Sequence, residues 1–118
     1  MSQLIGNLIT IQPQIRVFHW QTASFAQHKA FGDAYETFDQ LIDEFVEVYL
    51  GKSQNRINDD ELNITLYTAI EPTKFLNHCA EYLNAFNDVF ESSDSDLLNI
   101  RDELLATVNK LKYLLTLK

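Results

Sequence analysis

Six apolar or aromatic residues between Phe31 and Tyr49 follow one another at alternating spacings of four and three residues. They are Phe31, Tyr35, Phe38, Ile42, Phe45 and Tyr49. This spacing places all of them on one side of an α-helix, whereas a strand would need alternation at every second residue. The helix predicted over Ala26–Leu50 would be roughly 37 Å long, which is typical of a bundle helix. The chain therefore has to fold around one long amphipathic helix.

Three further helices are predicted, over Gln3–Thr22, from Pro72 onward, and over Asp96–Leu117. Their inward-facing residues also recur at helical spacing: Leu4, Leu8, Ile11, Ile15 and Phe18; Phe75, Cys79, Tyr82, Phe86 and Val89; Leu97, Leu104, Val108, Leu111 and Leu115. Pro13 should kink the first helix or mark a short unpaired first turn. Gly51 should supply the left-handed residue just beyond the second helix. With only 3 Gly and 2 Pro in 118 residues, the chain lacks the turns of a β-sandwich or barrel.

The connections between these helices differ in length. The first and the last are short, and helices joined in that way are antiparallel neighbours. The middle connection is long and contains Leu62–Ile70, where apolar and polar residues alternate; we expect a short helix or an extended segment there. A connection of that length can run the whole length of a bundle. The predicted fold is an all-α, ferritin-like four-helix bundle with one long crossover, in a single domain over residues 1–118.

Charge and composition exclude several classes of protein. The chain has 9 Lys and Arg against 17 Asp and Glu, a formal net charge of −8, which disfavours DNA binding through phosphate contacts. No apolar run approaches a membrane span, so no membrane partner is expected. Met1–Ile15 contains no Lys or Arg, unlike the start of a signal peptide. The single cysteine, Cys79, excludes an internal disulfide and suits a reducing, cytoplasmic compartment.

An acidic stripe lies beside the apolar side of the second helix rather than opposite it. At about 100° per residue, Glu36, Asp39 and Glu47 fall near Asp43 on the helical wheel, and His28 lies on the same side. Carboxylates and imidazoles together form a ligand set for iron, manganese or zinc. From helix physics alone, a solvated face and a structural histidine are the commoner explanations of such a pattern.

The order of these residues resembles the Dps proteins, the ferritin-like DNA-protecting proteins of starved bacteria. The resemblance is specific from His19 to Glu47: Phe18-His19-Trp20, a short polar loop, His28-Lys29-Ala30-Phe31, and then Asp43 and Glu47 on the same helix. The last predicted helix is similar to the family's final helix in pattern, from Asp96 through Leu115.

The resemblance implies a ferroxidase site at a two-fold subunit interface. His19 and His28 would come from one subunit, and Asp43 and Glu47 from its mate. Iron(II), with zinc or manganese as the other candidates, would bind there and be oxidised, preferably by hydrogen peroxide. The implied assembly is a homo-oligomer built from dimers, a twelve-subunit shell that stores the mineral.

The chain departs from the family pattern in several ways. The family's acidic ligand one turn after the second histidine falls on Gly32, so Asp33 and Glu36 are the alternative donors. The loop before His28 is shorter than usual, and the basic N-terminal arm is absent because the first cationic residue is Arg16. The whole chain is short, as a reduced, phage-type version would be. These departures leave a second hypothesis, a catalytically silent bundle that serves assembly or protein interaction.

Overall fold

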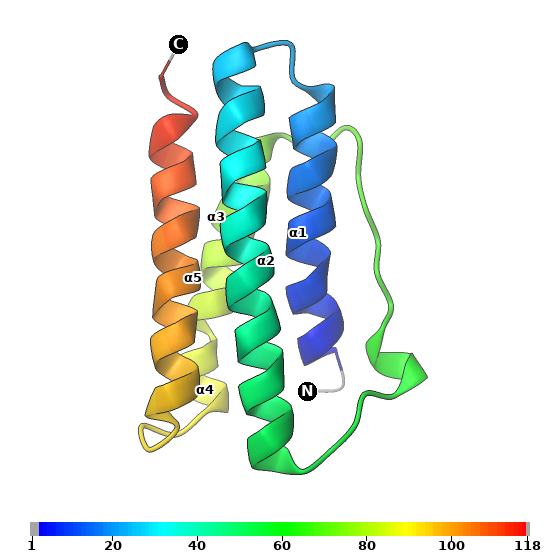
Figure 1. The fold of residues 1–118 in the computed structure, drawn as a ribbon, viewed down its shortest axis with the longest axis vertical. Helices are drawn as coiled ribbons and strands as arrows, with labels where there is room; N and C mark the ends of the chain where they lie inside the picture. Colours follow the sequence, from blue (N-terminus) through cyan, green and yellow to red (C-terminus); the bar gives the residue numbers. More distant parts are fainter. Residues whose placement is uncertain (1–2, 118) are drawn as a thin grey trace.

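The protein is a bundle of four long helices with one crossover strap (Figure 1). The computed structural model describes residues 3–117 and contains no strand within that range. Its elements are α1 Leu4–Gln21, α2 Phe25–Ser53, the 3₁₀ turn η1 Asp59–Glu61, α3 Pro72–Asn84, the short α4 Phe86–Val89 and α5 Ser95–Leu114. The predicted all-α class is therefore confirmed.

The helices follow an up-down-down-up order. In Figure 1, α1 rises from the N-terminus and α2 descends beside it. The chain after α2 then passes through η1 and returns as an extended segment along the outer side of α1, so that α3 also descends and α5 rises. The long crossover is confirmed, and of the two alternatives for its second half the extended one is correct. One long connection in a four-helix bundle is the connectivity of ferritin-like folds.

The core lies where the apolar sides of the four helices meet. Phe31, Phe38, Ile42 and Phe45 of α2 are all at most 1% exposed, whereas Tyr35 and Tyr49 are half-buried at the margins. α2 packs against α1 and α5, and α5 packs against α3. Two groups of aromatic rings fill the centre, Phe18 with Phe31 and Phe75, and Phe45 with Phe86 and Phe90. Burying such rings is the largest favourable contribution to a small bundle.

The predicted end of the second helix was wrong. α2 continues through Gly51 to Ser53, and the left-handed residue after it is Gln54, with φ of 61°. The last turn is held from outside, because Lys52 pairs with Asp94 at 3.0 Å and Asp96 at 2.8 Å at the start of α5. The hydrogen bond that Lys52 donates to Asp96 in particular raises the pKa of Lys52. A contact from another helix has thus outweighed the local preference for ending at glycine.

Of the two structures predicted at Pro13, a kink or a short first turn, the first turn was wrong, because α1 runs unbroken past Pro13 from Leu4 to Gln21. Pro13 therefore does not mark a first turn.

The third predicted helix is interrupted at Ala85, and Val89 is 42% exposed rather than inward-facing. Arg101 of α5 reaches into this break and is only 6% exposed. Its guanidinium donates to the carbonyl of Leu83 at 2.9 Å and to Oδ1 of Asn87 at 2.8 Å. A buried charge with satisfied donors holds α5 to the junction of α3 and α4.

One buried side chain fastens the crossover to the bundle. Gln14 of α1 is 0% exposed, its Nε2 donates to the carbonyl of Tyr67 at 2.8 Å, and its Oε1 accepts from the N–H of Tyr67 at 2.8 Å. The amide therefore satisfies both backbone groups of one residue, as a neighbouring strand would. This pair of hydrogen bonds fixes the position of the crossover along the axis of α1.

We expect Gln14→Leu to lower the free energy of unfolding by about 1–3 kcal/mol, because leucine is similar in size to glutamine but cannot hydrogen-bond to either backbone group of Tyr67. Urea denaturation monitored by circular dichroism checks this. The matched control is Gln12→Leu, two residues earlier, since Gln12 has only an exposed hydrogen bond to Asp39 at 3.2 Å and a buried Oε1 without a partner in the described chain. Equal losses in the two variants would contradict the role of Gln14.

Candidate functional site

The turn between α1 and α2 brings His19 and His28 together. Only three residues separate the two helices. Ser24 caps α2, because its Oγ accepts from the backbone N–H of Gln27 at 3.2 Å, and Thr22 donates to Oε1 of Gln27 at 2.9 Å. These contacts hold the turn, so residues at equal distances before and after it face each other.

The two imidazoles form a reciprocal pair. Nδ1 of His19 lies 2.7 Å from the carbonyl oxygen of His28, and Nδ1 of His28 lies 2.8 Å from the carbonyl oxygen of His19. The rings are stacked, with centroids 3.7 Å apart and planes inclined by 22°. Each side chain therefore binds the backbone of the other residue, and both rings are held in one orientation.

This pairing determines which nitrogen of each ring carries the proton. A carbonyl oxygen can only accept, so both Nδ1 atoms must be the N–H donors. In a neutral imidazole the other nitrogen, Nε2, then keeps its lone pair. Histidines that bind metals through Nε2 are commonly oriented by this same Nδ1–H bond to a carbonyl.

Gly32 provides the space that this pair needs. A Cβ at this position would lie 3.0 Å from Cε1 and 3.2 Å from Nδ1 of His19. The sequence comparison marked Gly32 as the position of a missing acidic ligand, and the structure shows what the absent side chain permits. The imidazole of His19 approaches the backbone of α2 there and reaches the carbonyl of His28.

We expect Gly32→Ala to be less stable than Gly51→Ala by about 1 kcal/mol. Both glycines are inside α2, where alanine is favoured by up to about 1 kcal/mol, but a Cβ at Gly51 has no neighbour within 4 Å. At Gly32 the ring of His19 must move, and its hydrogen bond to His28 weakens. Urea unfolding of the two variants measures the difference, and nitrogen NMR of the imidazoles reports the protonated atom. Equal gains in stability would show that His19 does not rest on residue 32.

The predicted carboxylate ligands are not beside the histidines within one subunit. Asp43 and Glu47 are exposed on the same helix as His28, but 15 and 19 residues later, which is roughly 22 and 28 Å along the axis. Glu36 is exposed and roughly 12 Å from His28 by the same measure. Across residues 3–117 there is no group of three or more His, Cys, Asp or Glu side chains placed to hold one ion.

Asp33 faces another neighbour. Its carboxylate lies 3.8 Å from Nζ of Lys29, and both side chains are about 70% exposed. It borders a groove of about 250 Å³ between α2 and α5, together with Thr37 and Lys110. Asp33 therefore lies on the α5 side of the helix, whereas His19 approaches from α1.

Two further contacts continue along the edge between α1 and α2, and the sequence analysis did not find them. The guanidinium of Arg16 lies 3.9 Å from the ring centroid of Tyr35, and Gln12 donates to Asp39 at 3.2 Å. Counting outward from the turn would not have predicted either pair, because Tyr35 and Asp39 lie about one helical turn further from it than the residues level with Arg16 and Gln12. Asp39 is thus engaged within the subunit.

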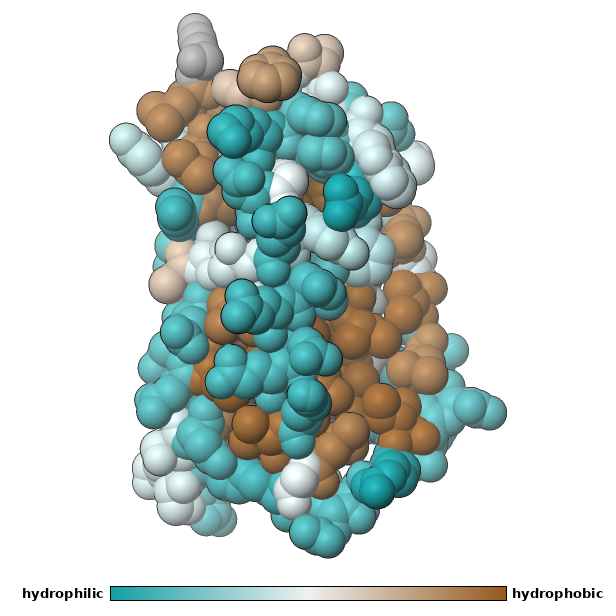
Figure 2. All heavy atoms as spheres, viewed as in Figure 1, coloured by the Kyte–Doolittle hydropathy of each residue, from teal (hydrophilic) through white to brown (hydrophobic). Residues whose placement is uncertain are grey.

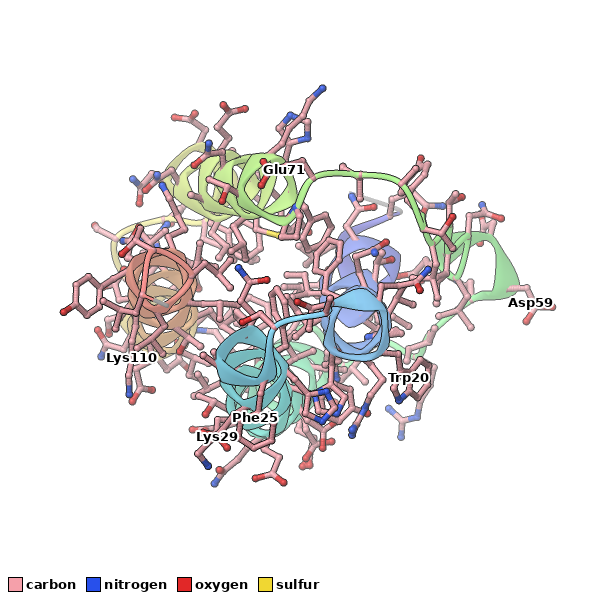
Figure 3. The ribbon with its side chains drawn as sticks, turned by 90° about the horizontal axis from the view of Figure 1, so that it is seen from above. Trp20, Phe25, Lys29, Asp59, Glu71 and Lys110 are labelled. Atoms are coloured by element: carbon pink, nitrogen blue, oxygen red, sulfur yellow. The ribbon has the colours of Figure 1, made fainter. Side chains whose placement is uncertain are left out.

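Exposed aromatic side chains surround the histidine pair. Trp20 is 70% and Phe25 is 80% exposed, and Figure 3 shows both projecting from the end of the bundle at the α1–α2 turn. The ring of Phe25 is roughly parallel to that of His28, with centroids 6.3 Å apart. Large exposed rings of this kind are typical of surfaces that a partner covers.

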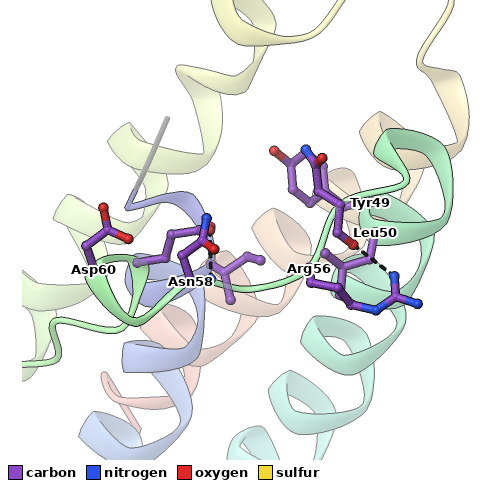
Figure 4. A pocket seen from close by; sticks show the side chains of 8 residues that line it. Tyr49, Leu50, Arg56, Asn58 and Asp60 are labelled. Atoms are coloured by element: carbon purple, nitrogen blue, oxygen red, sulfur yellow. Dashed lines mark hydrogen bonds between the residues drawn. The ribbon is translucent and has the colours of Figure 1, made fainter.

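The other candidate positions offer fewer reactive or metal-binding groups. Cys79 is buried, and burial raises the pKa of its thiol to about 12, so the nucleophilic thiolate is not populated at neutral pH. A pocket of about 380 Å³ lies at the opposite end of the bundle from the histidines (Figure 4). Tyr49, Leu50, Arg56 and Asp60 contribute to its lining, which has no histidine or cysteine.

The geometry defines a class of protein: a four-helix bundle with one long crossover and an oriented pair of histidines at one end. The chain belongs to the family of unknown function DUF5856, which matches residues 19–115 and so includes all six predicted ligands. It is also similar to an uncharacterized 14.6 kDa protein from the mobD-ri intergenic region of Enterobacteria phage T4. The two are 25% identical over 117 residues, which cover 99% of this chain and 88% of the phage protein. No solved structure matches the chain significantly.

Proposed function

We propose that this protein is a Dps-like, cytoplasmic, homo-oligomeric bundle that binds and oxidises iron(II) at a site shared by two subunits. His19 and His28 of one subunit and Asp43 and Glu47 of its mate would provide the ligands. The observation that carries the proposal is the reciprocal histidine pair, in which both Nδ1–H groups are used by carbonyl oxygens and both Nε2 lone pairs remain for a metal ion.

The donor set suits the proposed substrate. Imidazole nitrogen and carboxylate oxygen bind iron(II), and carboxylates also stabilise the iron(III) that forms from it. Zinc and manganese share this preference and are the alternative metals. Reduction of one hydrogen peroxide to water takes two electrons, which two iron(II) ions supply. The protein's part is to hold the ions where the oxidant can reach them.

The distance between the histidines and the carboxylates supports a two-fold arrangement. If α2 of one subunit lies antiparallel to α2 of its mate, residues at equal distances on either side of the two-fold axis face each other. His28 then faces Asp43 and Glu47 when the axis passes halfway between them, close to Thr37. Such a dimer would contain two identical sites, each roughly 12 Å from the axis along the helix.

Glu36, and not Asp33, is the alternative carboxylate on the side of α2 that Gly32 occupies, but at roughly 12 Å along the helix from His28 it would lie between the two sites. Glu36 lies one turn further along from Gly32 and is exposed without an ion pair in the described structure. Asp33 pairs with Lys29 and borders the groove to α5. Glu36 is also next to the proposed axis, where the mate's residues come close.

The chain's charge supports storage or detoxification of iron without DNA binding. With a net charge of −8 and a single cation before His19, phosphate contacts cannot supply the usual affinity. No helix in the described range is long and apolar enough to span a membrane.

A catalytically silent assembly bundle is the second candidate. The observation in its favour is that the histidines and carboxylates of one subunit do not form a metal-binding group within residues 3–117. In this case His19 and His28 would serve only to close the α1–α2 turn.

We expect Asp43→Asn and His28→Ala each to weaken metal binding by at least about tenfold, because each removes one ligand from a shared ion. The double variant should lose little more than the worse single variant, since groups that hold one ion act as a unit. Anaerobic calorimetric titration with iron(II) measures the binding, and absorbance after addition of peroxide measures the oxidation rate.

Glu103→Gln is the matched control, because Glu103 is an exposed carboxylate on α5, away from the α1–α2 edge. It should leave both measurements unchanged. Equal oxidation rates in wild type and Asp43→Asn, without saturable binding in either, would exclude the ferroxidase and leave the silent bundle. A monodisperse monomer at micromolar concentration would exclude the shared site.

A further inference from the structure

The crossover presents its apolar residues to solvent. Leu62, Ile64 and Leu66 are 42%, 42% and 44% exposed. The residues between them lie on the other side of the chain: Asn63, Thr65 and Tyr67 line a pocket of about 350 Å³ against α1 and α3. The alternation noted in the sequence is therefore that of a strand, and both of its sides are exposed, Tyr67 at 53%.

The backbone of the same segment has one free edge. Successive residues of an extended chain direct their N–H and C=O groups to opposite sides. Since both groups of Tyr67 point to Gln14 of α1, those of Leu66 point away from the bundle, as do those of Ile64. Within residues 3–117, the backbone groups of Ile64 and Leu66 make no hydrogen bond. Unpaired edges are the positions at which another strand can add.

This side of the molecule is also its least charged part. Leu62–Ile70 contains no Asp, Glu, Lys or Arg, and α1 beside it contains only Arg16. Figure 2 shows hydrophobic residues along the edge where the crossover runs. For a chain with a net charge of −8, two copies repel each other over most orientations. An uncharged side is where they can meet with the least repulsion, so a second copy is the partner that this side accommodates and the rest of the surface disfavours.

We propose that the Leu62–Tyr67 segments of two copies pair antiparallel across a two-fold axis, as a two-stranded ribbon that covers Leu62, Ile64 and Leu66. An antiparallel pair of identical strands satisfies two-fold symmetry by itself, because residue i faces j and j faces i. The free groups of Ile64 and Leu66 become donors and acceptors of the ladder. The tether at Gln14 keeps the strand in place before the partner arrives, which lowers the entropic cost of pairing.

The position of the strand agrees with the axis needed for the shared metal site. Gln14 lies on α1 between Gln12 and Arg16, whose partners on α2 are Asp39 and Tyr35. Tyr67, which Gln14 holds, therefore lies in the same middle part of the bundle as Thr37, where the axis of the proposed metal site falls. One two-fold axis can thus serve both surfaces. The position of this axis rests on the proposed function, whereas the pairing of the two strands rests on the free strand edge.

Hydrogen exchange of the wild-type chain tests the pairing directly. Because Ile64 and Leu66 have no internal acceptor, their amides should exchange rapidly in the dilute monomer. In the oligomer we expect both to slow by at least about tenfold, since their N–H groups enter a ladder. Fast exchange of both amides in a sample shown by sedimentation to be oligomeric would overturn the ribbon, as would a monomer at every concentration tested.

Ile64→Lys tests the same surface by mutation. We expect the dissociation constant of the dimer to rise by about a hundredfold or more, because two isoleucines lose their burial and two like charges face each other. Asn109→Lys is the control, since it adds the same charge at an exposed position on α5, away from the crossover. It should leave the dimer intact. Sedimentation velocity compares the variants, and circular dichroism confirms that each is folded.

If Ile64→Lys does not fold, cross-linking replaces it. Single cysteines at Ile64, Leu66 and Thr68 in a Cys79→Ser background should form an intersubunit disulfide fastest at the position nearest the axis, and slowly at the others. Uniformly slow cross-linking would overturn the ribbon.

Metal titration of the same samples separates the two proposals. Protected amides with no saturable iron(II) binding would retain the ribbon and exclude the metal site. Iron(II) binding in a dimer that Ile64→Lys leaves intact would retain the metal site and exclude the ribbon.

Discussion

The packing of α1 against α2 around a three-residue turn is the constraint on which the rest of this structure depends. So short a turn fixes the register of the two helices, with His19 and His28 almost equally far from it and the side chain of Arg16 reaching a residue about one helical turn beyond its own level. His19 therefore meets His28, and Arg16 meets Tyr35 further down. The same register sets the height of Gln14, and with it the height of the crossover that Gln14 holds. The turn therefore determines which residues meet along the whole α1–α2 edge of the bundle.

The two unusual surfaces of the subunit have one physical explanation in common. The acidic stripe of α2 and the apolar, unpaired crossover both lack a complement in the isolated chain. The exposed carboxylates would need cations or hydrogen bonds once a partner covered them, and strand edges need another strand. A two-fold partner would supply both at once. The oriented histidines add a reason why such a partner would matter chemically, because a metal ion shared between subunits links assembly to ligand binding.

Sequence patterns predicted where the helices form but not where they end. The stripe from Phe31 to Tyr49 predicted α2 because burial along one side of a helix requires that spacing. Gly51 was expected to end the helix, but Lys52 is held by Asp94 and Asp96, which are 42 and 44 residues further along the chain. Val89 was expected to face the core, but the helix breaks at Ala85, where Arg101 of α5 enters. These errors share one cause, since a local pattern contains no information about contacts from distant segments.

Composition, charge and periodicity determined by themselves that the chain is all-α, that one connection crosses the bundle, and that His19 and His28 flank a turn. These properties follow from local physics: residues at fixed spacing share one side of a helix, and a short connection makes antiparallel neighbours. The tertiary structure alone decided that the two imidazoles bind each other's carbonyls, that Gly32 makes room for them, and that the crossover offers a free strand edge. Those features depend on distances between groups that are far apart in the chain or on different helices, and such distances exist only once the helices have packed.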